Sequence, residues 1–254
     1  MLRHIMILGC LLGLAGPALA GEAYQFPENQ DEADFIANEV IATFYHELGH
    51  GLIDVMKIPV LGKEEDAADT LSVILMNDIW NEESATQILT SDATAYALAA
   101  ADPNLAPDES SFADVHSLDI QRYYAVVCLF YGANPEVRKQ LAVNLGLPAE
   151  KLDSCPREYQ QAADAWSAVL QGTEPGPDKK GLVMAPGQDG VPLADLLAEE
   201  VKGMNEKFGL PEEISVIVAD CGEANAFYSS SDKTITMCNE YAQDLQKRWD
   251  AQPK

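Results

Sequence analysis

Residues 31–56 have the sequence DEADFIANEVIATFYHELGHGLIDVM, which predicts one long amphipathic helix. Apolar side chains recur every three or four positions, and on a helix they form one stripe: Ile36, Val40, Phe44, Leu48, Leu52 and Val55. A neighbouring stripe is polar: Glu39, Thr43, His46, His50 and Asp54. A polar stripe on a surface helix normally carries Lys and Arg. This one carries the residue types that bind metal ions, which indicates that the helix holds a site.

His46 and His50 enclose Glu47 in a His-Glu-x-x-His sequence. Residues four apart share one face of a helix, so both imidazoles can bind one metal ion. Glu47 projects beside them, where its carboxylate can take a proton from a metal-bound water. Histidine is rare in this chain, and chance would produce such a motif in roughly one comparable chain in a few hundred. The motif therefore predicts a metal centre with Glu47 as general base.

A catalytic zinc site usually has three protein ligands and an open position for water. Glu65 follows His50 by fifteen residues, beyond a Pro/Gly turn, and an antiparallel helical hairpin would return it to the level of the histidines. Asp69 lies on the same face of that second helix, four residues further, where it can accept the free ring N–H of a ligand histidine. Glu65 is the preferred third ligand because it begins a Glu-x-x-Ala-Asp sequence, and Glu64 is the competing one.

His116 is the only other histidine beyond the first twenty residues. One interpretation makes it a helix-surface or partly buried residue, hydrogen-bonded to Asp114 or Asp119. The other makes it a catalytic donor to the oxyanion that forms during hydrolysis, a role that His or Tyr plays in many zinc peptidases. Arg122 could bind a carboxylate or support the fold.

Residues 1–20 have the pattern of a signal peptide. Arg3 supplies a positive charge, residues 5–14 are apolar, and Ala18-Leu19-Ala20 is a small-x-small cleavage site. The apolar stretch is too short for a membrane span. We therefore expect an exported protein, periplasmic or secreted, that does not associate with the membrane after cleavage.

The exported chain is strongly acidic. Without Arg3 it has 15 basic residues against 41 acidic ones, a net charge of −26. This charge would repel phosphate backbones and anionic lipid headgroups, so we expect no nucleic-acid binding.

Four cysteines remain in the exported chain: Cys128, Cys155, Cys221 and Cys238. An even number in an oxidising compartment favours two disulfides, which have three possible connectivities. A hairpin turn near Ser231 would bring Cys238 close to Cys221. By elimination, Cys128 pairs with Cys155.

The rest of the chain reads as helices followed by a small β region. Further helices are predicted at 64–80, 83–100, 111–131, 136–145, 154–171, 193–208 and 239–249. A strand is expected at 213–219 and a hairpin from 226–229 and 233–237. Residues 172–192 are rich in proline and glycine and have no periodicity, which indicates a linker between a helical metal-binding core, residues 21–171, and an α/β segment, residues 193–254.

The HExxH motif with a downstream Glu-x-x-x-Asp resembles the gluzincin class of zinc peptidases. More closely, four segments resemble a bacterial family of putative metallopeptidases, a domain of unknown function. They are residues 44–53, 64–69, 114–122 and 221–228, and the resemblance covers most of the exported chain. The resemblance implies a zinc-dependent peptidase acting on a peptide or protein substrate.

One departure from gluzincins concerns the order of segments. Gluzincins usually place a β-sheet before the HExxH helix, and its edge strand pairs with the substrate backbone. We associate the Cys-Gly-x-x-Asn-Ala-Phe-Tyr segment with the region before the HExxH motif. Here it lies at residues 221–228, near the C-terminus. The order predicts a circularly permuted arrangement, in which residues 192–254 fold back as the missing sheet.

The predicted fold is therefore α+β and mostly α-helical, with a gluzincin-like helical core and a small C-terminal sheet. The predicted activity is peptide-bond hydrolysis by a zinc-activated water, with Glu47 as base and Zn2+ held by His46, His50 and Glu65. Two other interpretations stay open: a non-catalytic zinc-stabilised binding or scaffold protein, and a structural helix in which the motif is accidental.

Overall fold

The computed structural model describes residues 23–252, so the predicted signal peptide lies outside the described residues. The helices are α1 (Gln30–Met56), α2 (Glu64–Ile79), α3 (Glu82–Ala101), α4 (Asp119–Ala133), α5 (Pro135–Asn144), α6 (Ala149–Leu152), α7 (Cys155–Val169), α8 (Pro192–Lys207) and α9 (Asn239–Asp250). Two 3-10 turns are η1 (Pro103–Leu105) and η2 (Ser111–Ala113). The strands are β1 (Leu182–Met184), β2 (Ile214–Ala219), β3 (Ala226–Ser229) and β4 (Thr234–Cys238). The protein is a mostly helical α+β fold, as predicted.

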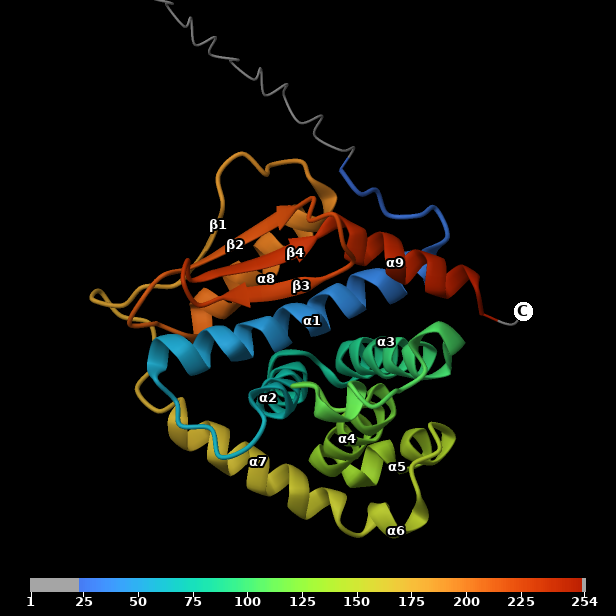
Figure 1. The fold of residues 1–254 in the computed structure, drawn as a ribbon. Helices are drawn as coiled ribbons and strands as arrows, with labels where there is room; N and C mark the ends of the chain where they lie inside the picture. Colours follow the sequence, from blue (N-terminus) through green and yellow to red (C-terminus); the bar gives the residue numbers. More distant parts are fainter. Residues whose placement is uncertain (1–22, 253–254) are drawn as a thin grey trace, which may run out of the picture.

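Helix α1 lies at the centre of the molecule, with the sheet, α8 and α9 on one side and helices α2 to α7 on the other (Figure 1). Strands β3 and β4 pack on one side of α1, and helices α2 and α3 pack on the other. Helices α4 and α7 form a further layer beyond α2 (Figure 1). Because α1 is covered on both sides, several of its polar side chains are buried along with its apolar stripe, while Thr43, His50 and Asp54 stay partly exposed. Glu39, His46 and Glu47 are all buried.

Helix α1 begins where the Asn29 side chain accepts hydrogen bonds from the backbone N–H groups of Asp31 and Glu32. The acidic side chains of that first turn suit the positive end of the helix dipole. The helix ends at Lys57, whose left-handed φ of 56° lets the chain turn back toward α2.

Two small residues let α1 and α2 approach closely. A Cβ atom built on Gly49 would lie 3.0 Å from the Cα of Ala68, so the glycine removes the atom that would keep the helices apart. Gly49 lies between Glu47 and His50, and Ala68 lies between Glu65 and Asp69. The point of closest approach is therefore the level at which the predicted ligands face each other.

The sheet has the strand order β1-β2-β4-β3. Strand β2 runs parallel to both β1 and β4, and β3 pairs antiparallel with β4 as a hairpin. Burial alternates along β2, as expected for a strand with one face in the core. Strand β3 is the edge of the sheet nearest the histidines. It lies along α1 (Figure 1).

The C-terminal segment does return to the HExxH helix, which is the packing that a permuted order requires. The permutation itself stays a prediction. The proline- and glycine-rich stretch 172–192 contains a strand that its composition did not reveal, because Leu182–Met184 pairs with the start of β2. Three residues are too few to show a strand periodicity.

The predicted helix at 111–131 is wrong over its first third. Residues 111–113 form the short turn η2, the chain then runs as a loop, and α4 begins only at Asp119. The Asp114 side chain accepts a hydrogen bond from the backbone N–H of His116 at 2.8 Å, a local bond that competes with helix formation. His116 therefore lies on a loop and not on a helix.

Two disulfides join Cys128 to Cys155 and Cys221 to Cys238, which confirms the predicted pairing. The first fastens α4 to the start of α7, and the second fastens the loop after β2 to the end of β4. Disulfides are compatible with an exported protein. In residues 23–252 no helix combines the length and the apolarity needed to cross a membrane.

Candidate metal centre

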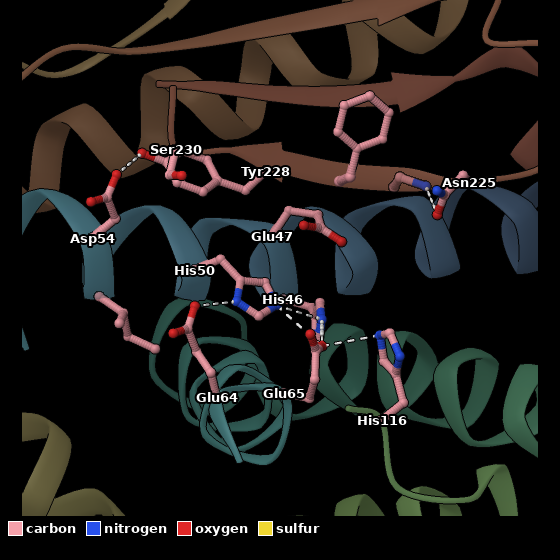
Figure 2. A pocket seen from close by; sticks show the side chains of 13 residues that line it. His46, Glu47, His50, Asp54, Glu64, Glu65, His116, Asn225, Tyr228 and Ser230 are labelled. Carbon is pink, nitrogen blue, oxygen red and sulfur yellow. Dashed lines mark hydrogen bonds and ion pairs between the residues drawn. The ribbon is translucent and has the colours of Figure 1, made fainter. Parts of the chain in front are cut away.

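Three predicted ligands meet between α1 and α2. The Nε2 atoms of His46 and His50 are 3.2 Å apart, and each is 3.2 Å from the Oε2 atom of Glu65. Figure 2 shows both imidazoles directed from α1 toward Glu65 on α2. The hairpin predicted from the turn after α1 therefore places the carboxylate at the level of the histidines.

The spacing of these three atoms fits a bound metal ion. In a tetrahedral site with metal–ligand bonds of 2.0–2.2 Å, neighbouring donor atoms are roughly 3.3–3.6 Å apart, slightly more than here. Two imidazole nitrogens and one carboxylate oxygen also form a common ligand set for a catalytic metal with an open position. Among the described residues, the only other His/Cys/Asp/Glu cluster of comparable tightness includes Cys221 and Cys238, which are joined to each other.

The outer nitrogen of each imidazole is held by a carboxylate. Nδ1 of His46 donates to Asp69 at 2.7 Å, and Nδ1 of His50 donates to Glu64 at 2.9 Å. These bonds fix the tautomer in which both Nε2 atoms keep a free lone pair. Glu64, the competing third ligand, thus contacts the outer side of His50, whereas Glu65 faces the inner side.

Asp69 is itself held by Arg122 on α4. The guanidinium donates from Nε to Oδ2 at 2.8 Å and from Nη2 to Oδ1 at 2.6 Å. It also lies over the ring of Tyr96, 4.5 Å from the centroid. The carboxylate that Arg122 binds therefore belongs to the protein itself, so Arg122 supports the fold.

Glu47 lies on α1 between the metal ligands and strand β3. In Figure 2 its side chain lies over α1, with β3 on one side of it and His46 and Glu65 on the other. The carboxylate accepts a hydrogen bond from the backbone N–H of Tyr228, which comes from that strand. The edge strand thus fixes the position of this carboxylate beside the candidate metal site.

His116 reaches the site from the loop before α4. Its Nε2 atom lies 3.1 Å from Glu65 Oε2, and its Nδ1 atom lies 3.0 Å from Asp114 Oδ1. Lys63, just before α2, donates to the backbone carbonyls of Asp114 and His116 at 3.1 and 2.9 Å, so the loop is tied to the end of α2. The Asp114 contact is the one expected if His116 is a surface residue. The short distance between His116 and Glu65 favours the other interpretation, a donor to the oxyanion.

The hydrogen bonds of the site shift the pKa values of its groups. Burial would lower the pKa of His46, but hydrogen bonds to Asp69 and Glu65 outweigh it and raise the value to about 9. Burial would raise the pKa of Glu65 and Asp69, but the three histidines hold the first well below its usual range and Arg122 does the same for the second. Burial raises the pKa of Glu47. Metal binding would displace the proton on Nε2 of each ligand imidazole and leave the Nδ1 proton in its bond to the carboxylate.

An open cleft of about 470 Å³ runs along the site. It extends from His116 and Asn225 at one end to Asp54 and Ser230 at the other. Strand β3 lies along one side of the cleft, Glu64, Glu65 and His116 lie along the other, and α1 with its histidines lies between them (Figure 2). A chain laid in this cleft would pass over the ligands and Glu47.

The sequence-predicted residues His46, Glu47, His50, Glu65, Asp69 and His116 are thus all brought together. Their roles stay predictions. The sequence did not predict that Asn225 would line the cleft, and it indicated Glu39 only as part of a polar stripe. No sequence signal distinguishes Asp92, a residue of α3 that lies near Arg122 of α4.

A helical core with an HExxH centre and an adjoining sheet edge defines a metallopeptidase-like protein. The family described as "Putative metallopeptidase" matches residues 14–170 and 187–254, so the chain belongs to this family. No curated protein and no solved structure matches the chain.

Proposed function

We propose that this protein is an exported zinc-dependent peptidase that hydrolyses peptide bonds. One observation carries the proposal: two imidazole nitrogens and a carboxylate oxygen lie 3.2 Å from one another in an open cleft, with Glu47 beside them. Membership of the metallopeptidase family supports a metal-dependent hydrolase. Two histidines and one glutamate form a ligand set that catalytic zinc uses in peptidases, which is why we choose zinc as the ion.

His46, His50 and Glu65 would hold the ion, and Asp69 and Glu64 would orient the two imidazoles. When bound, zinc supplies Lewis acidity and lowers the pKa of water toward ~7. Glu47 accepts the proton of the attacking water and passes it to the leaving amine. His116, directed into the cleft, donates a hydrogen bond to the oxygen that gains charge during the attack.

Strand β3 supports a peptide as the substrate class. It is an edge strand that forms a wall of the cleft, and an extended chain can add to such an edge through main-chain hydrogen bonds. Ordinary peptides fit this mode because recognition of the main chain does not depend on sequence.

The test is Glu47→Gln in the purified exported chain. The amide keeps the size of the side chain but cannot take a proton, so we expect cleavage of a peptide library to fall about 10²–10⁴-fold. Zinc content measured by mass spectrometry should stay at one ion per chain. Glu136→Gln, at an exposed position on α5, is the control and should leave both quantities unchanged.

The rival function, a non-catalytic zinc-stabilised binding or scaffold protein, predicts a different result. It requires bound zinc and no cleavage by the unaltered chain under any condition. Equal cleavage by the Glu47→Gln variant and the unaltered protein would instead refute the assigned base. Export is supported by the two disulfides, and N-terminal sequencing of the protein recovered from the periplasm or medium tests it.

A further inference from the structure

The open cleft continues at His116 into a second, larger hollow, the loop pocket. His116 lies at one end of the cleft (Figure 2), and its side chain lines both hollows. The loop pocket has a volume of about 650 Å³. Its walls come from the last turn of α3, the loop 102–118 and the first turn of α4. Of the side chains in these walls, the proposed catalytic steps use only that of His116.

The loop pocket leaves apolar side chains open to solvent. The apolar part of its lining consists of Ala100, Leu105, Pro107, Leu118 and Ile120. Leu105 is 48% exposed and Ile120 is 43% exposed. Phe112 and Val115, on the same loop, are exposed as well. Apolar side chains that gather at a surface are unfavourable in water, and such patches mark binding sites.

The polar groups of the pocket already have partners within the protein. Arg122 binds Asp69 through two hydrogen bonds. Asp114 accepts a hydrogen bond from the backbone N–H of His116 and also contacts its ring. Ser117 donates to a carboxylate of α2 at 2.8 Å. A ligand would have to compete with these bonds for the polar groups, whereas the apolar surface is open to it, so the pocket favours an apolar ligand.

Hydrogen bonds also hold the loop in place. Lys63 donates to two backbone carbonyls of the loop, at 3.1 and 2.9 Å. The side chain of Asp108 accepts from the backbone N–H groups of residues 110 and 111, at 2.8 and 3.1 Å. A ligand can therefore bind without first ordering the loop, which lowers the entropy lost on binding.

We infer that the loop pocket binds a large apolar side chain of the peptide substrate, at one fixed distance from the cleaved bond. The inference rests on the proposed function, which places the cleaved bond in the adjoining cleft. An extended peptide advances about 3.3 Å per residue, so a chain that passes His116 places its next residues at the loop pocket. The carboxylate of Asp119, in the first turn of α4, would repel an acidic side chain there.

The experiment uses decapeptides of alanine and serine that carry one variable residue, which is moved through the peptide one position at a time. The variable residue is leucine, asparagine or lysine. Asparagine has nearly the shape of leucine but lacks its apolar surface. Mass spectrometry locates the cut bond, and initial rates give kcat/KM. We expect kcat/KM to be about tenfold higher for leucine than for asparagine at one distance from the cut bond.

Leu105→Ser and Ile120→Ser should each move this leucine to asparagine ratio toward one. Val143→Ser is the matched control, because Val143 is also 48% exposed but lies on α5, outside the pocket. It should keep the ratio of the unaltered protein. A ratio near one at every position, a ratio that survives both pocket substitutions, or a preference for lysine over leucine at the selective position would overturn the inference.

Calorimetry with the zinc-loaded Glu47→Gln variant and the same decapeptides separates this inference from the proposed function. Tighter binding of a leucine peptide that is lost when Ile120→Ser is added, without any cleavage by the unaltered protein, would support the loop pocket and refute the peptidase. Cleavage without preference for leucine in either rate or binding would support the peptidase and refute the loop pocket.

Discussion

Asp69 joins the candidate metal site to the helical layer through a single carboxylate. It accepts hydrogen bonds from His46 and Arg122 and is itself buried. The aspartate therefore both holds the His46 imidazole and neutralises the buried Arg122 guanidinium. Asp69 therefore links the position of the His46 imidazole to the position of α4.

Asp69→Asn should weaken zinc binding about 10–100-fold, because the amide holds the His46 tautomer less firmly. Competition against a chelator of known affinity measures this change. Asp78→Asn, near the other end of α2, is the control, since the Asp78 side chain accepts a hydrogen bond from neighbouring Asn77. An unchanged zinc affinity in Asp69→Asn would show that the carboxylate does not orient the ligand.

Asp54 has a comparable linking role at the other end of the cleft. It accepts hydrogen bonds from Lys233, in the hairpin turn between β3 and β4, and from the Tyr228 hydroxyl of β3. The bond from Lys233 is the main reason that the pKa of Asp54 falls from 3.8 to about 2. Asp54 thus fastens α1 to the sheet while it is ionised.

This shift predicts a dependence of stability on pH. A carboxyl group whose pKa is lowered in the folded state stabilises it above the unfolded pKa and loses that effect as the pH falls through the folded value. Asp54→Asn should therefore cost about 1 kcal/mol at pH 6, allowing for partial exposure to solvent, and progressively less between pH 4 and pH 2. Urea unfolding of both proteins at several pH values measures the difference. A difference that stays constant across this range would exclude the linkage.

At the scale of elements, the contact between α1 and α2 decides whether a site exists. Gly49 and Ala68 set how close the two helices come, and Glu65 reaches the histidines only at that separation. The apolar residues of both helices hold the contact together, and the small residues set its distance.

Gly49→Ala tests this contact. The new methyl group would lie 3.0 Å from the Ala68 Cα, a backbone atom that can move only with its helix. We expect weaker zinc binding and a loss of about 1–3 kcal/mol in unfolding free energy. Gly203→Ala makes the same change inside α8, where the methyl group meets nothing within 4 Å. That variant should be more stable by about 0.5–1 kcal/mol. Equal effects of the two substitutions would show that the close contact is unimportant.

The sequence predicted the helices well because their apolar periodicity is long and strong. Residues 31–56 and 64–80 gave α1 and α2 to within one residue at each end. It failed where a few local or distant contacts decide the structure. The loop that carries His116 depends on one Asp114 side-chain bond and on Lys63, and β1 depends on pairing with a strand thirty-two residues away.

The candidate site divides in the same way. His46, Glu47 and His50 follow from one helix, and Glu65 follows from one turn. The position of Asn225 in the cleft depends on how the C-terminal sheet packs on α1, and Asp92 comes close to Arg122 through the packing of α3. Residue spacing along the chain cannot predict either position.

At the scale of the whole molecule, residues before and after the 172–192 stretch share a single core through α1. The start of α1 and the end of α9 also meet. The ring of Trp249 near the end of α9 lies 5.2 Å from that of Phe35 near the start of α1, and Gln246 donates to Glu32 at 2.9 Å. The chain therefore nearly closes on itself, which is the geometry in which a change of segment order leaves the packing intact.

A permuted chain tests this arrangement. A short Gly/Ser linker would join residue 252 to residue 23, and new ends would open between Pro177 and Asp178, in an exposed stretch. The sheet would then precede the HExxH helix, as it does in gluzincins. We expect one zinc ion per chain and an unfolding free energy within about 2 kcal/mol of the original, because one short loop is exchanged for another.

The control permutation uses the same linker but opens the chain at Leu61, an exposed residue between α1 and α2. Opening there separates the helix that carries both histidines from the helix that carries Glu65, so this protein should bind zinc more weakly than the first permutant. If instead the chain opened at Pro177 fails to fold while the chain opened at Leu61 folds and binds zinc, the 172–192 connection itself must hold the sheet on α1. A sheet held by its own packing on α1 predicts the opposite order, because β3 contacts α1 directly and needs no particular connection to reach it.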